Sequence, residues 1–276
     1  MKNLKKPEIN DTAAFDNIVK RNRRKTHLGD EMYRQRILYR YSYYDNHKKH
    51  LNDITPLNET VWRKVKDELI QCYQGNSMIM RAIRREVLDD VCKCPYCGVN
   101  DPDTLDHYFD KKEYPEFSIY SPNLIPCCHS CNNRKGTKVF NQNHQRQYLH
   151  FYFDTIPDYQ FIFIRFFADN GIPRIKISLR FQKDEPSQCV IRNHFKSLEL
   201  ISKYRDVAGK KLSVIIDTLK NLHDSGESVD EIRKYLTSYY NALVKNRGAN
   251  YIETVIYEGV LNSKDFIEKF SKKALE

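Results

Sequence analysis

The chain has 276 residues, with 46 lysines and arginines against 36 aspartates and glutamates, so its formal charge is +10. Charged residues make up 30 % and hydrophobic residues 40 %, which excludes both a membrane-embedded protein and a wholly disordered one. No stretch approaches the roughly 18 uncharged apolar residues of a membrane-spanning helix. No apolar run follows the basic N-terminus, so we expect no signal peptide, a cytoplasmic protein and no membrane partner. The excess positive charge favours nucleic acid as an anionic partner.

Residues 1–90 are predicted to form a helical N-terminal region. Apolar residues recur every three or four positions in segments 31–51 and 60–73, as they do on the buried face of a helix. Asn58 precedes the second segment and is expected to be its N-cap. The basic run RNRRK at 21–25 fits either a solvated helix face or a contact with phosphate.

Residues 91–140 contain six of the eight cysteines and are too few to form a core without a metal or surrounding protein. Residues 141–276 are predicted to form a β-hairpin followed by helices. Alternating apolar residues in 158–167 and 173–181 indicate two strands, with the turn at 169–171. We therefore expect a mainly helical α+β protein, in which the outer regions form one helical body around the cysteine-containing module.

Two matched cysteine pairs carry the strongest signal in the sequence. They are CPYC at 94–97 and CHSC at 128–131. Each pair can present two thiolates from one tight turn, and two such turns give the tetrahedral coordination of a structural zinc site. Four sulfur ligands leave no position for water, so this zinc is not catalytic. The predicted ligands are Cys94, Cys97, Cys128 and Cys131.

The other four cysteines are expected not to bind this zinc. Cys92 could compete with Cys94, and Cys127 with Cys128, but neither alternative gives two C-x-x-C pairs. Cys72 and Cys189 stand alone in the sequence and are expected in the core.

The segment between the cysteine pairs resembles the HNH endonucleases, which have a ββα-metal fold. The matching elements are LDH at 105–107, NLIP at 123–126 and CNNRKG at 131–136. Segment 106–118 is more narrowly similar to the HNH subunit of Septu-type antiphage systems. The resemblance covers about 45 residues. It implies a zinc-clamped ββα-metal module embedded in the helical body.

The resemblance also implies roles for the matching residues. His107 would be the general base, which suits an imidazole near neutral pH, and Asn123 would brace the loop that orients it. Asp106 and Asn132 would bind the catalytic Mg2+ or Mn2+. Asp106 and His107 are adjacent, so on an extended strand their side chains point in opposite directions. They would need a strand end or a bulge to serve one site.

A predicted short helix at 129–135, ended by Gly136, carries the basic residues of the module. Arg134, Lys135 and Lys138 could contact substrate phosphates, although a basic helix end is equally consistent with plain soluble surface. Asp110 is expected to be a turn residue rather than a further metal ligand. His129 is expected to be an exposed bystander.

Together these features predict an HNH-family nuclease that hydrolyses phosphodiester bonds, with DNA as the favoured substrate and RNA, such as tRNA, as the alternative. The Septu likeness implies an effector of bacterial antiphage defence with an ATPase partner. A non-catalytic zinc module that binds nucleic acid or a protein partner explains the cysteines and the charge equally well. It does not explain the positions of Asp106, His107, Asn123 and Asn132.

Overall fold

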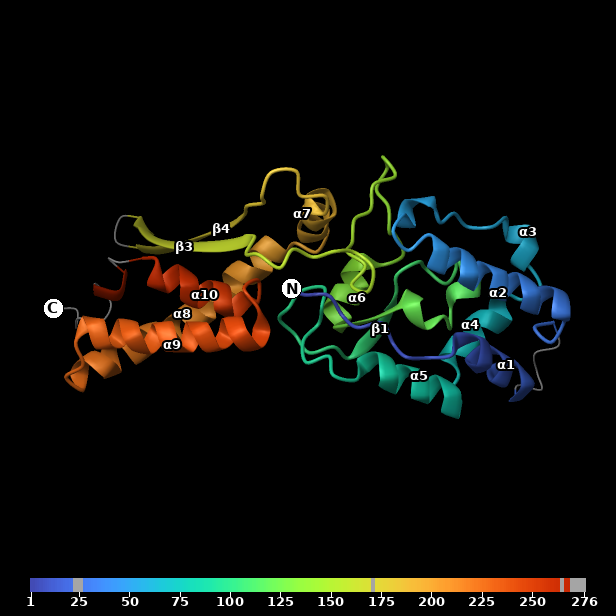
Figure 1. The fold of residues 1–276 in the computed structure, drawn as a ribbon, viewed down its shortest axis with the longest axis horizontal. Coiled ribbons are helices and arrows are strands. Elements are labelled where there is room, and N and C mark those ends of the chain that lie inside the picture. Colours follow the sequence, from blue (N-terminus) through green and yellow to red (C-terminus); the bar gives the residue numbers. More distant parts are fainter. Residues whose placement is uncertain (22–26, 170–171, 264–265, 269–276) are drawn as a thin grey trace. The chain divides into compact units, whose positions relative to one another are not determined.

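The computed structural model describes residues 1–21, 27–169, 172–263 and 266–268. The chain forms two compact units, drawn in Figure 1. The N-terminal unit contains residues 3–155, and the C-terminal unit contains residues 156–276 together with Met1 and Lys2. The fold is α+β, as predicted, with two separate two-stranded antiparallel sheets. We expected the outer regions to form one helical body. Instead, the N-terminal helices pack with the cysteine-containing segment, and the C-terminal region is a second body with its own core.

The N-terminal unit is built from short helices, one hairpin and three single-turn 3-10 helices. Its elements are α1 (Asp11–Arg21), α2 (Glu31–Asn46), η1 (Leu51–Asp53), α3 (Glu59–Trp62), α4 (Lys66–Gln74), α5 (Met78–Leu88), β1 (Thr104–His107), η2 (Pro115–Phe117), η3 (Ser121–Asn123), β2 (Leu124–Cys127) and α6 (His129–Lys135). Asn58 is the N-cap of α3 and accepts a hydrogen bond from the Thr60 amide. The helix predicted over 60–73 is divided into α3 and α4 by a turn. Of the basic run 21–25, Arg21 ends α1, and the remainder lies outside the described residues.

An aromatic core joins α2 to the segment between β1 and β2. Tyr44 of α2 is fully buried, and its ring meets those of Phe109, Phe117 and Tyr120 edge to face, with centroids 4.9–5.5 Å apart. Such contacts add to the free energy gained by burying each ring. The segment between β1 and β2 is therefore held in place by aromatic packing against α2.

The described part of the C-terminal unit includes a β-hairpin and a set of helices. Its elements are β3 (Ile162–Asp169), β4 (Ile172–Leu179), α7 (Gln188–Ser197), α8 (Leu200–Asp224), α9 (Val229–Arg247) and α10 (Ile252–Leu261). The hairpin agrees with the predicted strands, and Asp169 pairs with Ile172; residues 170–171 of the predicted turn lie outside the described residues. Gly259 lets α10 approach β3 closely, because a Cβ there would lie 2.8 Å from the Ile164 carbonyl oxygen. Within the described residues, no helix combines the length and apolarity needed to cross a membrane.

Candidate functional site

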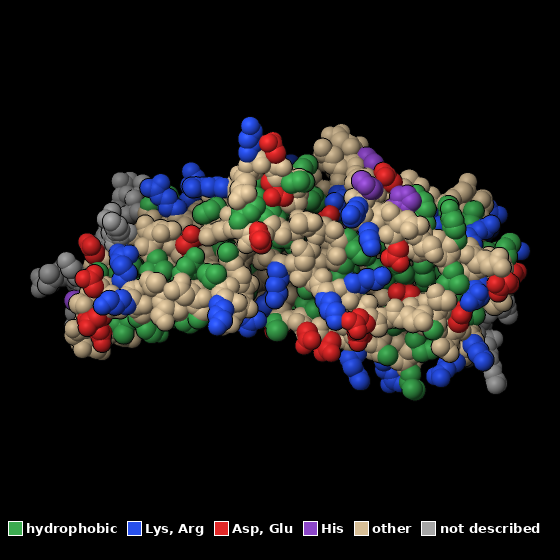
Figure 2. Space-filling model, viewed as in Figure 1, with side chains coloured by type: hydrophobic (Ala, Val, Ile, Leu, Met, Phe, Trp, Pro, Cys, Tyr) green, Lys and Arg blue, Asp and Glu red, His purple; other side chains and the backbone are tan. Residues whose placement is uncertain are grey.

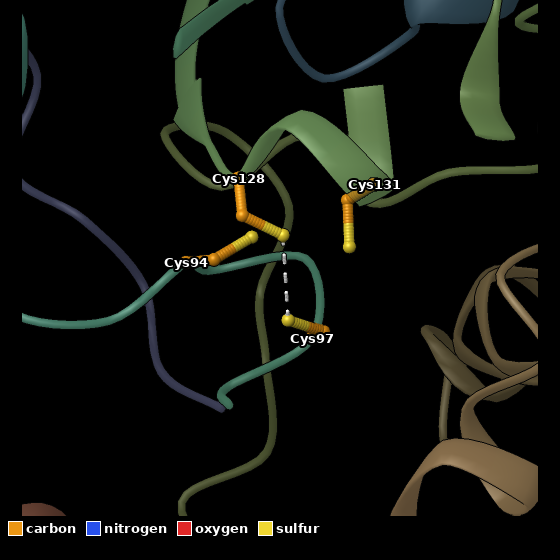
Figure 3. A group of neighbouring side chains, drawn as sticks. All are labelled: Cys94, Cys97, Cys128 and Cys131. Atoms are coloured by element: carbon orange, nitrogen blue, oxygen red, sulfur yellow. Dashed lines mark hydrogen bonds between the residues drawn. The ribbon is translucent and has the colours of Figure 1, made fainter. Parts of the chain in front are cut away.

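Four buried cysteines gather at one end of the β1–β2 hairpin (Figure 3). Cys94 and Cys97 lie in the turn before β1, and Gly98 closes this turn at a φ of 65° by donating its amide to the Cys94 carbonyl. Cys128 is the N-cap of α6, and Cys131 lies in its first turn. All four sulfur atoms lie within 4.8 Å of one another.

This cluster could hold a zinc ion. Tetrahedral zinc with Zn–S bonds of about 2.3 Å implies sulfur atoms about 3.8 Å apart, and the Cys97 and Cys128 sulfur atoms are 3.9 Å apart. The Asn100 side chain contacts the Cys128 sulfur at 3.6 Å and so supports the site from outside the four ligands. The competing residues are elsewhere: Cys92 is exposed, and Cys127 lies on β2 with its sulfur 3.7 Å from the Thr104 hydroxyl. Cys72 is buried as expected, whereas Cys189, expected in the core, is exposed.

The predicted strands and helix of the module form in the order strand, strand, helix. β1 and β2 pair without a bulge, with Asp106 opposite Ile125 and His107 opposite Leu124. Helix α6 packs against β1. It ends at Gly136, which has a φ of 57° and donates its amide to the Asn132 carbonyl. Because the strand is regular, successive side chains of β1 must point to opposite faces.

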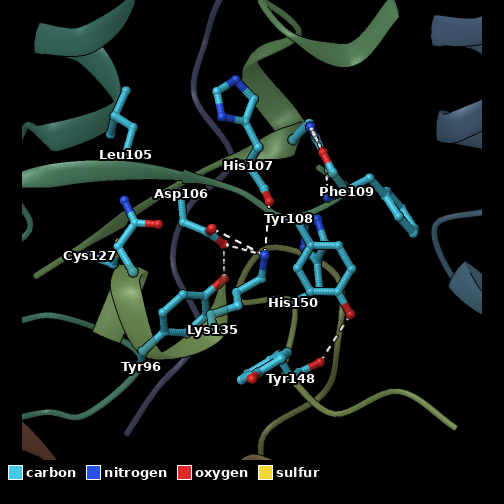
Figure 4. A network of polar contacts seen from close by, with 12 residues as sticks. Tyr96, Leu105, Asp106, His107, Tyr108, Phe109, Cys127, Lys135, Tyr148 and His150 are labelled. Atoms are coloured by element: carbon cyan, nitrogen blue, oxygen red, sulfur yellow. Dashed lines mark hydrogen bonds and ion pairs between the residues drawn. The ribbon is translucent and has the colours of Figure 1, made fainter. Parts of the chain in front are cut away.

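Asp106 faces α6, where Lys135 neutralises it (Figure 4). The Lys135 ammonium lies 3.1 Å from the carboxylate and also donates to the His107 carbonyl oxygen at 2.9 Å. The Tyr96 hydroxyl donates to Oδ2 of the same carboxylate at 2.6 Å. Burial raises the pKa of Asp106, and the Lys135 charge opposes that rise. Lys135 is itself 3 % exposed, so it does not join the phosphate-contacting surface predicted for it.

Asn132 of α6 lies against the same face of the hairpin as Asp106, near the start of β1. Its amide nitrogen donates to the Thr104 hydroxyl at 2.6 Å, and its side chain is one helical turn from Lys135. The structure thus brings the two predicted ligands Asp106 and Asn132 to the same face. The oxygen atoms of Asp106 are, however, already bound by an ammonium and a phenol. A hard divalent cation needs several oxygen ligands and waters, so the residues in this arrangement do not fit Mg2+ or Mn2+.

His107 points to the other face of the strand, away from Asp106 (Figure 4). Its Nε2 lies 2.9 Å from the Ser118 carbonyl oxygen, which can only accept, so Nε2 carries the proton and Nδ1 is the acceptor. The ring meets Tyr73 of α4 edge to face, with centroids 4.3 Å apart. Burial, and secondarily the charge of Lys111, lowers the pKa of His107 to about 3. The predicted base and the predicted metal ligands are therefore separated by the strand itself.

Asn123 is fully buried and forms the brace expected of it. Its amide nitrogen donates to the carbonyl oxygens of Phe109 and Phe117, and its amide oxygen accepts from the Phe109 amide at 2.8 Å. Phe117 directly precedes Ser118, whose carbonyl holds His107. Asn123 thus fixes both ends of the loop that sets the orientation of the imidazole.

The remaining predicted positions are peripheral. Arg134 and Lys138 are exposed on and just after α6. Asp110 is a turn residue, as expected, and its carboxylate accepts from the Lys112 amide at 2.9 Å. His129 is exposed and contacts Asn133 through Nε2 at 2.8 Å.

Three contact residues escaped the sequence analysis. Tyr96 stands between Cys94 and Cys97, and its place inside CPYC is the only signal that could have drawn attention to it. Tyr73 lies on α4, and the Ser118 carbonyl belongs to the backbone, so neither contact with His107 has a signature in the sequence.

The buried imidazole has a testable titration. We expect His107 to remain neutral at pH 5.5, whereas an ordinary histidine is largely protonated there. Between pH 6.5 and about 3 the unfolded chain binds one more proton at this residue than the folded chain does. Stability therefore falls as the pH is lowered through this window, by about 1.4 kcal/mol per pH unit. NMR titration of the imidazole Cε1 proton checks the prediction, and a titration midpoint near 6.5 would contradict it.

Comparison with known proteins finds a relative encoded by a phage. The chain is 28 % identical over 240 residues to protein ea31 of Escherichia phage lambda, and the match covers 77 % of this chain and 78 % of the phage protein. No described protein family matches the chain, and no solved structure does.

Proposed function

We propose that residues 92–136 form an HNH-type module and that the protein is a nuclease in which His107 activates water for phosphodiester hydrolysis. The observation that carries the proposal is how the loop holds His107: Asn123 donates to the Phe117 carbonyl oxygen, and the carbonyl of the next residue, Ser118, accepts from Nε2 of His107. It fixes one ring nitrogen as a donor to the backbone and leaves Nδ1 as the proton acceptor. A general base needs this defined tautomer and orientation. It also needs a pKa near the operating pH, so the proposal requires that His107 be less buried during cleavage than in this conformation, where burial lowers its pKa to about 3.

Positive charge beside the imidazole supports the proposal. The Lys111 ammonium lies 5.4 Å from the centroid of the Tyr73 ring, which also contacts His107. We therefore propose Lys111 as a phosphate contact in place of the buried Lys135. Arg134 and Lys138 remain proposed phosphate contacts on the outer side of α6.

The metal requirement is revised by the geometry. Asp106 is available to a cation only after Lys135 leaves it, so we assign no catalytic step to Mg2+ or Mn2+ in this conformation. The chemistry proposed for the chain itself is proton removal from water at Nδ1 of His107, with Lys111 binding the phosphate.

The wider biological role rests on the sequence resemblance. We propose a bacterial antiphage effector that acts with an ATPase partner on DNA, with RNA as the second substrate class. Release of Asp106 from Lys135 is a step that such a partner could drive. Co-purification with the products of neighbouring genes tests the partnership, and recovery of the chain alone argues against it.

The ion pair between Asp106 and Lys135 also favours a second candidate function. Because Lys135 occupies Asp106 and His107 lies on the opposite face of β1, the residues would suit a zinc module without catalytic activity. Such a module would bind nucleic acid or a protein partner and cleave nothing.

Cleavage assays on DNA and RNA with added Mg2+ or Mn2+ separate the two functions. Replacing His107 with Ala is expected to lower the rate by at least about 100-fold, because a general base contributes that much or more. His129→Ala, which removes an exposed histidine of the same module, should cleave like wild type. Zinc content and circular dichroism establish that the His107 variant is folded, and His107→Gln fills the cavity that Ala leaves. Binding without cleavage by wild type, with and without the co-purifying partner, would establish the second function instead.

A further inference from the structure

The outward face of the β3–β4 hairpin is basic and aromatic. The hairpin buries Ile162, Ile164 and Phe166 on its inner face, against α10 and α8. The described side chains on the outward face are Phe163, Arg165, Phe167, Arg174, Lys176, Ser178 and Arg180. Four of these are cationic and none is acidic. Figure 2 shows Lys and Arg side chains gathered along this hairpin.

Two features of this face oppose stability. Arg165 lies directly opposite Lys176 in the antiparallel register, and like charges at such cross-strand positions are destabilising. Phe167 is 41 % exposed, although burial of an aromatic ring is strongly favourable. Arg165, Lys176 and Phe167 do not contribute to the core of the C-terminal unit, because their side chains point away from it.

Positive charge continues beside β4. A hollow of about 560 Å3 borders residues 177–179, and Arg192, Lys196 and Arg205 line it together with one acidic residue, Glu199. Ser178 belongs both to this hollow and to the outward face. Ile177 and Leu179 of the inner face also line this hollow, so its positive charge lies beside β4 and meets the outward face at Ser178.

We propose that the outward face of the β3–β4 hairpin binds single-stranded nucleic acid. Arg165, Lys176 and the neighbouring cations would contact the phosphates, which relieves their mutual repulsion. Phe167 would stack against an unpaired base, an interaction that tolerates every base because each has a π-face. This inference goes beyond the proposed function, since it concerns the C-terminal unit and needs no catalytic step.

The test measures binding of the full-length chain to labelled poly(dT) and poly(U) without added divalent cation. Arg165→Glu is expected to weaken binding at least tenfold, and to lower the slope of log affinity against log salt by about 1, because one phosphate contact is lost. The same substitution places Glu opposite Lys176, so the melting temperature should stay level or rise. Weaker binding together with undiminished stability separates a binding role from a structural one.

Lys220→Glu is the matched control, because it makes the same charge change at an exposed position of α8. It should change affinity by less than about twofold, since Lys220 is not on the outward face of the hairpin. Phe167→Ala should weaken binding by roughly tenfold through lost stacking.

Equal losses for Lys220→Glu and Arg165→Glu would overturn the proposal in favour of net charge alone. The proposal would also be overturned if Phe167→Ala bound as tightly as wild type, or if the chain bound duplex with the same affinity as the single strand. Preferential binding to phosphatidylserine vesicles would overturn it as well. The binding assay needs no cleavage, so failure of the nuclease proposal leaves this test intact.

Discussion

Replacing Cys128 with Ser is expected to release zinc and unfold the N-terminal unit, leaving the helices of the C-terminal unit in place. Zinc binding by four-ligand sites contributes on the order of 10–16 kcal/mol in small peptides, as much as the whole stability of a typical domain. The four sulfur atoms tie the turn before β1 to the first turn of α6. Their loss should therefore free both β1 and the helix that packs on it.

Metal analysis and thermal unfolding check this expectation. Wild type should contain one zinc per chain, and Cys128→Ser should contain none and lose the earlier of two unfolding transitions. Cys189→Ser changes an exposed cysteine outside the cluster and should keep both the metal and the melting temperature. A wild-type chain without zinc that unfolds at the same temperature as the zinc-loaded chain would contradict the assignment.

Replacing Arg40 with Met is expected to lower the free energy of unfolding by about 3–5 kcal/mol, because it leaves a buried carboxylate without its partner. Arg40 of α2 donates through Nε to Glu116 at 2.8 Å, and both side chains are almost fully buried. Burial raises the pKa of Glu116, and the Arg40 charge opposes that rise. The same guanidinium donates to the Thr55 carbonyl oxygen, so its loss also loosens the segment before α3.

The loss of stability caused by Arg40→Met should depend on pH. Without Arg40, the pKa of Glu116 rises further above 4.5, so the folded chain binds a proton that the unfolded chain does not. The damage from Arg40→Met should therefore shrink as the pH falls from 8 toward 5. Urea unfolding at several pH values measures it. Arg40→Met combined with Glu116→Leu should recover most of the loss, because no buried charge remains.

Arg34 on the same helix provides the matched control. Its ion pair with Asp16 is partly exposed, and such surface pairs contribute about 0–1 kcal/mol. Arg34→Met should therefore cost far less than Arg40→Met. Equal costs would mean that Glu116 is not the buried charge we describe. Because Glu116 lies two residues before Ser118, the Arg40 substitution should also disturb the loop that orients His107.

Local patterns predicted the elements well. The 3.6-residue periodicity located α2, the strand alternation on both sides of Asp169 located β3 and β4, and the region after the hairpin is helical as expected. The spacing of the two C-x-x-C pairs selected the four cysteines that cluster, against Cys92 and Cys127. Gly136 ended α6 at the expected residue, because a left-handed φ there is open to glycine. These features depend on neighbouring residues in the chain, which a sequence displays directly.

The arrangement of the candidate site was decided by tertiary structure. Lys135 is basic and lies at a helix end, which in sequence reads as surface, yet α6 packs it beneath β1 against Asp106. The adjacency of Asp106 and His107 left open whether a bulge would bring them together. The unbroken register with β2 sends them to opposite faces instead, where α6 covers one and α4 contacts the other. The sequence determined which residues are present and which helices and strands they form. Packing decided which charges are neutralised and which side chains meet, because those outcomes depend on partners far apart in the chain.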